Sequence, residues 1–341
     1  YPITPASDIL HELAKHKNLG VKTFQAEDEI AGICAAIGAS FTGSLAITTT
    51  SGPGFALKAE GLGLAVMTEL PLVVVDVQRG GPSTGLPTKT EQSDLMQALY
   101  GRNGESPVIV LASSTPANCF DWAYMASKIT LEHNTPVVLL SDGYLGNGAE
   151  PWRIKSIQDM PSIKPLLAME GEEYQPYARD KKTLARKLAL PGTKGLEHRL
   201  GGLEKEDITG NVSYDPENHE KMSHIRAEKI RRIANLIPQQ EVFGKKQGDV
   251  LVVGWGGTHG SLYSAVDNLQ KEGESISLCQ FNYINPLPKN TADILNNYKT
   301  IVVCELNSGQ FANYLRINFQ GTIFNQYNKI QGFPFTTSEL E

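Results

Sequence analysis

Short apolar runs alternate with helical stretches through the first 145 residues, and this alternation constrains the fold more than any other feature of the sequence. The helical stretches occupy residues 28–40, 54–69 and 118–133. The runs are rich in valine, leucine, isoleucine and threonine, as strands are, and lie at residues 44–50, 70–77, 106–112 and 135–142. Strands that are apolar along their whole length are typical of a parallel sheet with helices on both faces, so we expect an α/β domain.

A second α/β pattern follows a change in composition. Strand-like runs at residues 249–256, 275–284 and 300–306 alternate with helical stretches at 258–273 and 290–298. The intervening segment is rich in glycine, proline and polar residues and then becomes a charged helical stretch at 219–237, whose lysines and arginines we interpret as a solvated face. We therefore predict three parts, which are a first domain at residues 1–160, an insertion and connecting segment at 161–245, and a second domain at 246–341.

Composition excludes several classes of protein. Thirty-one basic against 37 acidic residues give a net charge of −6, which argues against a nucleic-acid or membrane-surface partner. No apolar run approaches the roughly 20 residues that span a bilayer, and no signal peptide is visible, so we expect a cytoplasmic protein. The four cysteines are far apart and form no C-x-x-C pair, so we interpret them as small buried residues rather than ligands. The chain opens on Tyr1 without a methionine, and we expect sequence before it.

Two glycine-containing motifs are better explained as turns. The G-W-G-G-T-H-G stretch at 254–260 lies between a strand and a helix, but the third glycine of a dinucleotide-binding loop is replaced by His259. The S-D-G-Y-L-G-N stretch at 141–147 resembles the metal motif of thiamine enzymes, yet serine precedes Asp142 and Asn147 comes too soon. We predict a tight strand-to-helix turn for the first motif and a strand end for the second. No G-x-S-x-G or H-E-x-x-H motif supports a hydrolase or a metalloenzyme.

Charged residues next to the predicted first sheet are the candidates for chemistry. Arg79 and Lys89 lie in the loop Q-R-G-G-P-S-T-G-L-P-T-K-T-E-Q-S-D, which directly follows a valine-rich strand. A loop at the carboxyl end of a parallel strand is where open α/β sheets bind ligands, and a guanidinium matches a carboxylate bidentately. Glu29 opens a helix of small residues, where an acidic side chain also complements the helix dipole. For Glu27 and Asp28 we keep only the simpler interpretation, that their charges complement the helix dipole.

Four stretches, taken together, resemble a known family. They are YPITPASD, AEDEIAGICAAIGAS, the long run from TTTSGPGF through QRGGPSTGLPTKTEQSDL, and ELNSGQ. In this order they resemble the α subunit of 2-oxoacid:ferredoxin oxidoreductases, and most closely the α chain of 2-oxoglutarate:ferredoxin oxidoreductase. The resemblance runs from Tyr1 to the C-terminus. It implies a thiamine-diphosphate-binding pyrimidine-type domain followed by an α/β domain similar to the C-terminal domain of transketolase.

The resemblance also implies roles for individual residues. Glu29 matches the family's glutamate that hydrogen-bonds N1′ of the cofactor's aminopyrimidine, which makes it both a catalytic and a cofactor-binding residue. Thr4 and Arg79 match the pair that holds the carboxylate of the 2-oxo acid, and Thr88 matches a position that lines the pocket. Lys89 would suit a distal carboxylate such as that of 2-oxoglutarate, with a solvated loop lysine as the alternative.

The implied reaction needs groups that this chain lacks. In the family, the diphosphate-and-magnesium motif and the [4Fe-4S] cluster cysteines belong to the β subunit, so thiamine diphosphate would be shared between chains. A γ domain is fused in some members. The implied reaction is the oxidative decarboxylation of a 2-oxo acid with coenzyme A, which gives an acyl-CoA, carbon dioxide and two reduced ferredoxins. The sequence leaves open which 2-oxo acid is used and where coenzyme A binds.

Two other interpretations stay open at this point. A transketolase-like or 2-oxoacid dehydrogenase E1 β-type chain would share the order of the two domains but pass the intermediate to an aldose or a lipoyl arm. A scaffold subunit would keep the fold without any chemistry. The YPITP and QRGGPSTG motifs favour the ferredoxin-linked family over both alternatives.

Overall fold

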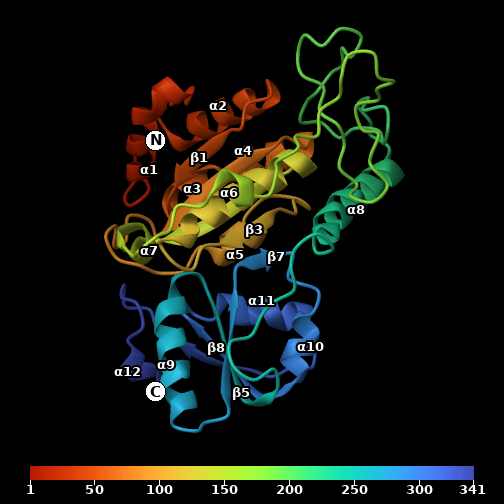
Figure 1. Ribbon diagram of the computed structural model, residues 1–341. Coiled ribbons are helices and arrows are strands. Elements are labelled where there is room, and N and C mark those ends of the chain that lie inside the picture. The colour runs from red at the N-terminus through yellow and green to blue at the C-terminus, as the bar shows by residue number, and fades with distance from the viewer.

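The computed structural model describes residues 1–341, and two sheets organise it (Figure 1). The first sheet has the order β1-β2-β4-β3-β7 and the second has the order β6-β5-β8-β9. All four strands predicted in the first 145 residues are confirmed and pair in parallel. They are β1 (Ile47–Thr50), β2 (Leu72–Gln78), β3 (Ile109–Ala112) and β4 (Pro136–Asp142).

Helices cover both faces of the first sheet. The helix predicted at residues 28–40 is confirmed, and Asp28 caps it by accepting a hydrogen bond from the Ala31 N–H at 2.7 Å. The single helix predicted at residues 54–69 is wrong in one respect, because the chain departs from helical geometry at Lys58, where ψ is −4°, and two helices result. The helices are α1 (Ser7–Leu13), η1 (Ala14–Leu19), α2 (Glu29–Phe41), α3 (Gly52–Leu57), α4 (Ala59–Thr68), α5 (Leu95–Tyr100), α6 (Asn118–His133) and α7 (Gly143–Asn147).

The second sheet contains the three predicted strands and a further strand, β9, that was not predicted. The strand predicted at residues 275–284 splits, because its last residues leave the second sheet and pair antiparallel with β3 of the first. Asn282 lies at the crossing and donates its Nδ2 hydrogen to the Ala112 carbonyl at 2.7 Å. The strands are β5 (Gly248–Trp255), β6 (Ile276–Phe281), β7 (Tyr283–Asn285), β8 (Tyr298–Glu305) and β9 (Phe324–Asn328), with η3 (Gly256–Thr258), α9 (His259–Lys271), α10 (Thr291–Asn296), α11 (Gln310–Asn318) and α12 (Thr337–Leu340).

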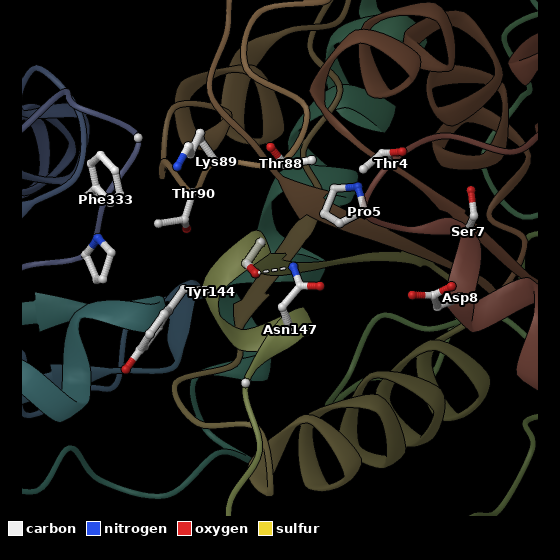
Figure 2. A pocket seen from close by; sticks show the side chains of 14 residues that line it. Thr4, Pro5, Ser7, Asp8, Thr88, Lys89, Thr90, Tyr144, Asn147 and Phe333 are labelled. Atoms are coloured by element: carbon white, nitrogen blue, oxygen red, sulfur yellow. Dashed lines mark hydrogen bonds between the residues drawn. The ribbon is translucent and has the colours of Figure 1, made fainter.

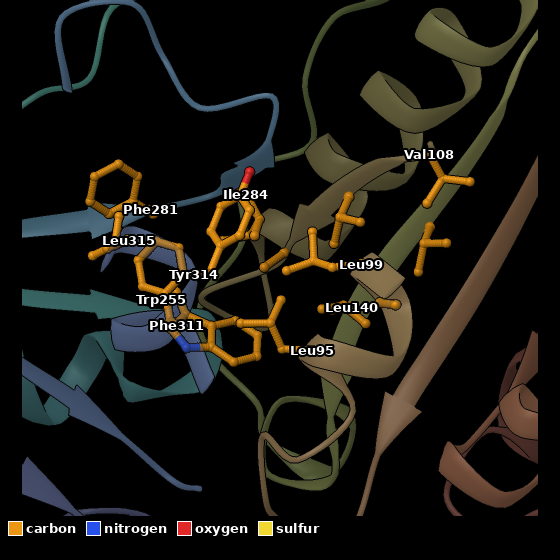
Figure 3. Packing of buried hydrophobic residues seen from close by; sticks show 14 of the residues in the cluster. Leu95, Leu99, Val108, Leu140, Trp255, Phe281, Ile284, Phe311, Tyr314 and Leu315 are labelled. Carbon is orange, nitrogen blue, oxygen red and sulfur yellow. The ribbon is translucent and has the colours of Figure 1, made fainter. Parts of the chain in front are cut away.

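One hydrophobic core joins the two sheets (Figure 3). The cluster contains 35 buried residues, among them Leu95 and Leu140 from the first domain and Trp255, Phe281 and Phe311 from the second. Phe281 and Phe311 meet edge to face with ring centroids 5.3 Å apart. The second domain is therefore fixed against the first by packing as well as by the shared strand β7.

The loop that carries Arg79 is also bonded to the second domain, through Gln92. The Gln92 backbone N–H donates to the Leu306 carbonyl, and the Leu306 N–H donates to Oε1 of Gln92, each at 3.0 Å. Nε2 of Gln92 donates to the Trp255 carbonyl at 2.7 Å, while Nδ2 of Asn307 donates to the Gln92 carbonyl, also at 2.7 Å. The ELNSGQ stretch at 305–310 thus holds the end of this loop.

The segment between the domains has little regular structure. Residues 148–215 contain one short turn of 3-10 helix, η2 (Ile157–Asp159), and isolated bridges, and α8 (Pro216–Ile233) follows them. The helix expected at residues 219–237 therefore exists, but the prediction that its cations form a solvated face is wrong for two of them. Arg226 and Lys229 are buried, because both side chains turn inward to carboxylates.

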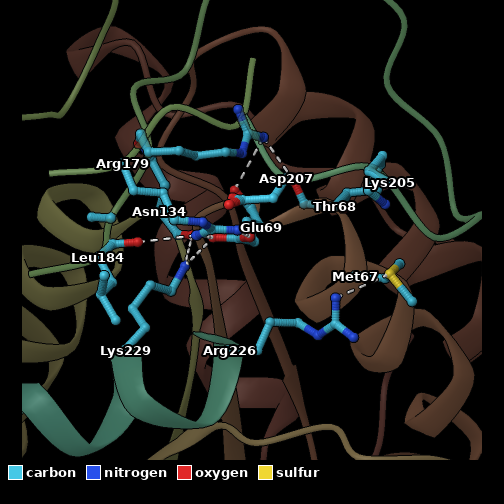
Figure 4. Close-up of polar contacts among 12 residues, drawn as sticks. Met67, Thr68, Glu69, Asn134, Arg179, Leu184, Lys205, Asp207, Arg226 and Lys229 are labelled. Atoms are coloured by element: carbon cyan, nitrogen blue, oxygen red, sulfur yellow. Dashed lines mark hydrogen bonds and ion pairs between the residues drawn. The ribbon is translucent and has the colours of Figure 1, made fainter. Parts of the chain in front are cut away.

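Lys229 belongs to a buried charge cluster centred on Glu69, whereas Arg226 pairs with Glu204 (Figure 4). Glu69 accepts hydrogen bonds from Arg179 on both carboxylate oxygens, at 2.5 and 2.9 Å, and from Lys229 at 2.6 Å. Arg186 donates to the Thr68 carbonyl at 2.7 Å and lies over the Tyr177 ring. The ion pairs lower the pKa of Glu69 well below its usual range. The cluster anchors the irregular segment and α8 to the end of α4.

Candidate active site

Glu29 begins α2 and lies at the carboxyl end of β1. Its side chain is 5% exposed and packs against the turn that starts α3. A Cβ atom on Gly54 would stand 2.6 Å from Oε1 of Glu29 and 2.2 Å from Oγ1 of Thr50, so only glycine fits there. No side chain or backbone N–H of the chain donates to the Glu29 carboxylate; the one hydrogen bond of this residue to a side chain runs from Lys58 to its backbone carbonyl, at 3.0 Å. Glu29 is therefore a buried carboxylate that has no donor from the chain and can accept a hydrogen bond from a ligand.

Arg79 and Thr4 are brought together at the end of the neighbouring strand. Nη1 of Arg79 donates to the backbone carbonyl of Thr4 at 2.7 Å, and the arginine is only 7% exposed. Its Nε is buried without a partner. A buried guanidinium with a free donor favours an anionic ligand, because an unmet donor in a dry site costs free energy.

Thr4 and Thr88 line a pocket of about 480 Å³ (Figure 2). Lys89 is the only cation among its lining residues, and its ammonium lies 4.2 Å from the centroid of the Phe333 ring. The side chain of Lys89 is half-buried against the second domain, and its role stays open. Glu29 does not line this pocket, and the structure places it instead beside β1 and α3.

The S-D-G-Y-L-G-N stretch contributes to the pocket, although sequence reasoning gave it no functional part. Asp142 ends β4 as predicted and caps α7, accepting hydrogen bonds from the Tyr144 and Leu145 N–H groups at 2.8 and 3.0 Å. It also accepts from the Thr90 hydroxyl and from the Gly257 N–H, which joins the two domains. Because the carboxylate already has four donors, it is poorly placed to bind a metal. Tyr144 then faces the pocket.

The G-W-G-G-T-H-G stretch is a tight turn, as predicted. β5 ends at Trp255, η3 follows, and α9 begins at His259. A Cβ atom on Gly254 would stand 2.3 Å from Cδ1 of Leu262, and one on Gly257 would stand 2.3 Å from Oδ2 of Asp142. The glycines therefore allow α9 to pack closely on its sheet and the turn to pack against the first domain.

Two buried carboxyl groups lie behind Arg79, and sequence reasoning missed them. Asp76 on β2 is fully buried, and no N–H or hydroxyl donates to it. It contacts the carboxyl of Asp94, and burial together with this neighbour raises the pKa of Asp76 well above its usual range. Two buried carboxyls side by side each disfavour ionisation of the other. A charged residue inside the apolar run L-V-V-V-D-V was the signal that could have revealed the pair.

Neither cysteines nor acidic clusters form a metal centre in the chain. All four cysteines are free, and no group of three or more histidine, cysteine, aspartate or glutamate side chains could hold an ion. The expectation that all four are buried is wrong for Cys34, which is exposed, and for Cys119, which is half-buried, whereas Cys279 and Cys304 are buried on strands. No helix is long and apolar enough to cross a membrane.

Comparisons with known proteins agree on one family. The model of the thiamine-diphosphate-binding domain of pyruvate flavodoxin/ferredoxin oxidoreductase matches residues 1–214, and that of core domain II of pyruvate:ferredoxin oxidoreductase matches residues 248–340. The 2-oxoglutarate oxidoreductase subunit KorA of Mycobacterium tuberculosis is 53% identical over all of this chain and 52% of its own length. The 2-oxoglutarate synthase subunit KorA of Archaeoglobus fulgidus is 34% identical over 91% of this chain and 82% of its own length.

A solved structure extends the match to three dimensions. It is the 2-oxoglutarate:ferredoxin oxidoreductase from Magnetococcus marinus with 2-oxoglutarate, coenzyme A and succinyl-CoA bound, which superposes with a TM-score of 0.93 at 35% identity. The match covers all of this chain and 60% of that one. The chain therefore spans only about half of the M. tuberculosis relative and three-fifths of the M. marinus chain.

Proposed function

Because the chain belongs to the α subunits of the 2-oxoacid:ferredoxin oxidoreductases, we propose that it supplies the pyrimidine-binding half of a thiamine-diphosphate site in such an enzyme. The proposed reaction is CoA-dependent oxidative decarboxylation of a 2-oxo acid, with ferredoxin as the electron acceptor. The observation that carries the proposal is the buried carboxylate of Glu29, which has no donor from the chain and lies against the glycine turn of α3.

The surroundings of Glu29 suit the cofactor's aminopyrimidine. Residues 52–54 have no side chain larger than proline, and the absent Cβ of Gly54 leaves room for the Glu29 carboxylate. When bound, the cofactor would supply a carbon acid suited to reaction at a keto carbon. Glu29 would accept the proton shared with ring nitrogen N1′, in a buried site where charge-assisted hydrogen bonds are strengthened.

Arg79, Thr4 and Thr88 are proposed to bind the 2-oxo acid. The exposed side chains of Thr4 and Thr88 line the pocket, whereas Arg79 does not line it and reaches it only through its hydrogen bond to the Thr4 carbonyl, with Nε buried and unpartnered. Lys89 is the lining cation available for a second carboxylate, which would favour 2-oxoglutarate over pyruvate. The relatives and the M. marinus structure, which are named for 2-oxoglutarate, support this choice of substrate.

The remaining parts of the enzyme are proposed to come from other chains or segments. The chain offers no group of residues for a metal ion and no cysteine cluster, so the Mg²⁺ ion and the [4Fe-4S] cluster would be held by a β subunit. The name of the A. fulgidus relative, which calls it a subunit, supports a partner chain. Ferredoxin, coenzyme A and a γ domain complete the proposed assembly.

Glu29→Gln in the full protein copurified with its partner tests the proposal. Glutamine keeps the shape of the side chain but cannot take the proton, so we expect exchange of the cofactor's C2 proton to slow by roughly 10²-fold or more, the usual scale for a positioned acid–base group. The measurement is C2 hydrogen–deuterium exchange followed by NMR. Glu27→Gln, on an exposed neighbour that precedes the helix, is the control. Unchanged exchange in Glu29→Gln would remove this residue from the proposed role.

A further inference from the structure

Lys58 is a buried cation that the proposed chemistry has not yet used. It lies where the α3 and α4 helices meet, and its side chain is 0% exposed. Its ammonium makes one hydrogen bond, to the backbone carbonyl of Glu29 at 3.0 Å, and no carboxylate lies within ion-pair distance of it. Burial of an ammonium without a paired carboxylate costs free energy, so Lys58 lowers the stability of the folded chain.

The position of the ammonium is also unfavourable for α2. It lies against the first turns of this helix, where a Cβ atom on Gly32 would stand 3.4 Å from Nζ. Helix N-termini favour negative charge, so a cation there does not stabilise the helix. Neither packing nor helix stability accounts for Lys58.

We propose that Lys58 is a positioning residue for Glu29, because its hydrogen bond to the Glu29 backbone carbonyl fixes the first turn of α2 and so the start of the Glu29 side chain. The inference rests on the role proposed for Glu29. The ammonium would also stabilise negative charge on the carboxylate while the proton shared with N1′ lies on the ring. Stability is thereby given up for function at this site.

The titration of Lys58 supports the proposal. Burial lowers its pKa to about 8, and the nearby Glu29 and Asp28 carboxylates oppose that shift. The other titratable groups facing the ammonium are the thiol of Cys34 and the amino group of Tyr1. The charge on Lys58 is therefore present at neutral pH and is lost as the pH rises through about 8.

Lys58→Met in the cofactor-free full protein, copurified with its partner, is the first test. In the unfolded chain a lysine keeps a pKa near 10.5, so the folded form gains stability from this group as the pH rises from about 8 to 10.5. Lys58→Met should melt several degrees higher than the wild type at pH 7. Its stability should also rise less than that of the wild type as the pH increases from about 8 to 10.5. A lower melting temperature at pH 7 would show that Lys58 is a structural residue and overturn the proposal.

Exchange of the C2 proton is the second test. In the protein loaded with thiamine diphosphate, Lys58→Met should slow exchange at least tenfold at pH 7, and the difference from wild type should shrink above pH 8. Lys205→Met is the matched control, since Lys205 is also buried, donates to backbone carbonyls and has a pKa of about 8, but lies in the irregular segment. That control should leave exchange unchanged.

The two proposals fail separately. If Glu29→Gln slows exchange and Lys58→Met does not, the role of Glu29 stands and that of Lys58 is wrong. If Glu29→Gln leaves exchange unchanged, the proposed function of Glu29 fails first, and the inference about Lys58 fails with it.

Discussion

Glu29 and Arg79 have unusual surroundings for charged side chains, and those surroundings mark them as functional candidates. Each is at least nine-tenths buried, and neither forms an ion pair within the chain. The sequence predicted both residues, because one is a carboxylate at the start of a helix and the other is an arginine directly after a strand. It did not predict the hydrogen bond from Arg79 to the Thr4 backbone carbonyl, because that bond depends on where the N-terminal segment lies in the fold. The roles themselves stay predictions.

Arg79→Ala should weaken use of the 2-oxo acid and leave cofactor binding nearly intact. Loss of one charge-assisted pair in a dry site removes about 2–5 kcal/mol, or roughly 30-fold to several thousand-fold in kcat/KM. Steady-state kinetics of the copurified enzyme with a viologen acceptor, together with thiamine diphosphate titration, measure both effects. Arg79→Lys should recover only part of the loss because it lacks the planar fork. Wild-type kinetics in Arg79→Ala would contradict the assignment.

In the same assay, Lys89→Met distinguishes a role of Lys89 in binding the distal carboxylate of the substrate from a role in packing against the second domain. If Lys89 meets a distal carboxylate, the change should raise KM for 2-oxoglutarate at least tenfold and leave pyruvate, which has no second carboxylate, nearly unchanged. Because methionine still packs on Phe333, the contact with the second domain is kept. Equal effects on both substrates would assign Lys89 to packing alone.

At the scale of elements, the sequence predicted the apolar strands and missed the polar strand β9. The apolar runs at 70–77 and 135–142 became β2 and β4, whereas β9, with the polar sequence F-N-Q-Y-N, has four exposed residues and gave no such signal. The helical period of α8 was also readable. Its buried Arg226 and Lys229 were not, since their carboxylate partners come from residues 69 and 204, far away in the sequence.

Glu69→Gln should destabilise the attachment of α8 strongly. Glu69 is the only carboxylate that pairs with Arg179 and Lys229, and removing one partner of a buried ion pair costs about 3–5 kcal/mol. Urea denaturation followed by circular dichroism measures the loss. Glu228→Gln, which removes surface pairs with Arg231 and Arg232, should cost less than about 1 kcal/mol. Similar losses in the two variants would refute the anchoring role of Glu69.

The same cluster predicts a dependence of stability on acid. The pKa of Glu69 is lowered in the folded chain, so its contribution is fully present above about pH 4.5 and is lost as the pH falls below that value. Glu69→Gln should therefore lose less stability than wild type between pH 5 and pH 3. A parallel decline of the two proteins over this range would contradict the prediction.

At the scale of the whole molecule, the domain interface was not predictable from periodicity. The ELNSGQ stretch was noticed only for its resemblance, yet it closes on Gln92 through several hydrogen bonds and so ties the loop of Arg79 to the second domain. The proposed boundaries at residues 160 and 245 remain predictions, and the shared core crosses the second of them. Hydrogen bonds between residues more than 160 positions apart leave no local pattern in the amino-acid sequence.

Gln92→Ala should loosen this interface. The change leaves the Leu306 N–H without its partner, whereas the Trp255 carbonyl keeps the Thr258 hydroxyl as a donor. We expect a loss of roughly 1–3 kcal/mol in urea denaturation, the usual cost of a buried unpaired group, and a higher KM for the 2-oxo acid. Gln97→Ala, which removes an amide nitrogen that has no partner, should change stability by less than about 1 kcal/mol. Equal stability of the two variants would count against the interface role.

The pairing of β7 with the first sheet affects how the chain folds during its synthesis. On the ribosome, β1 to β4 emerge long before Tyr283–Asn285, so the outer edge of β3 stays unpaired while the irregular segment, α8 and β5 are still being synthesised. An apolar strand with an open edge is a template for association with other chains. Nascent chains that pause before residue 285 should therefore be the ones that recruit chaperones, and release from them should follow the arrival of β7.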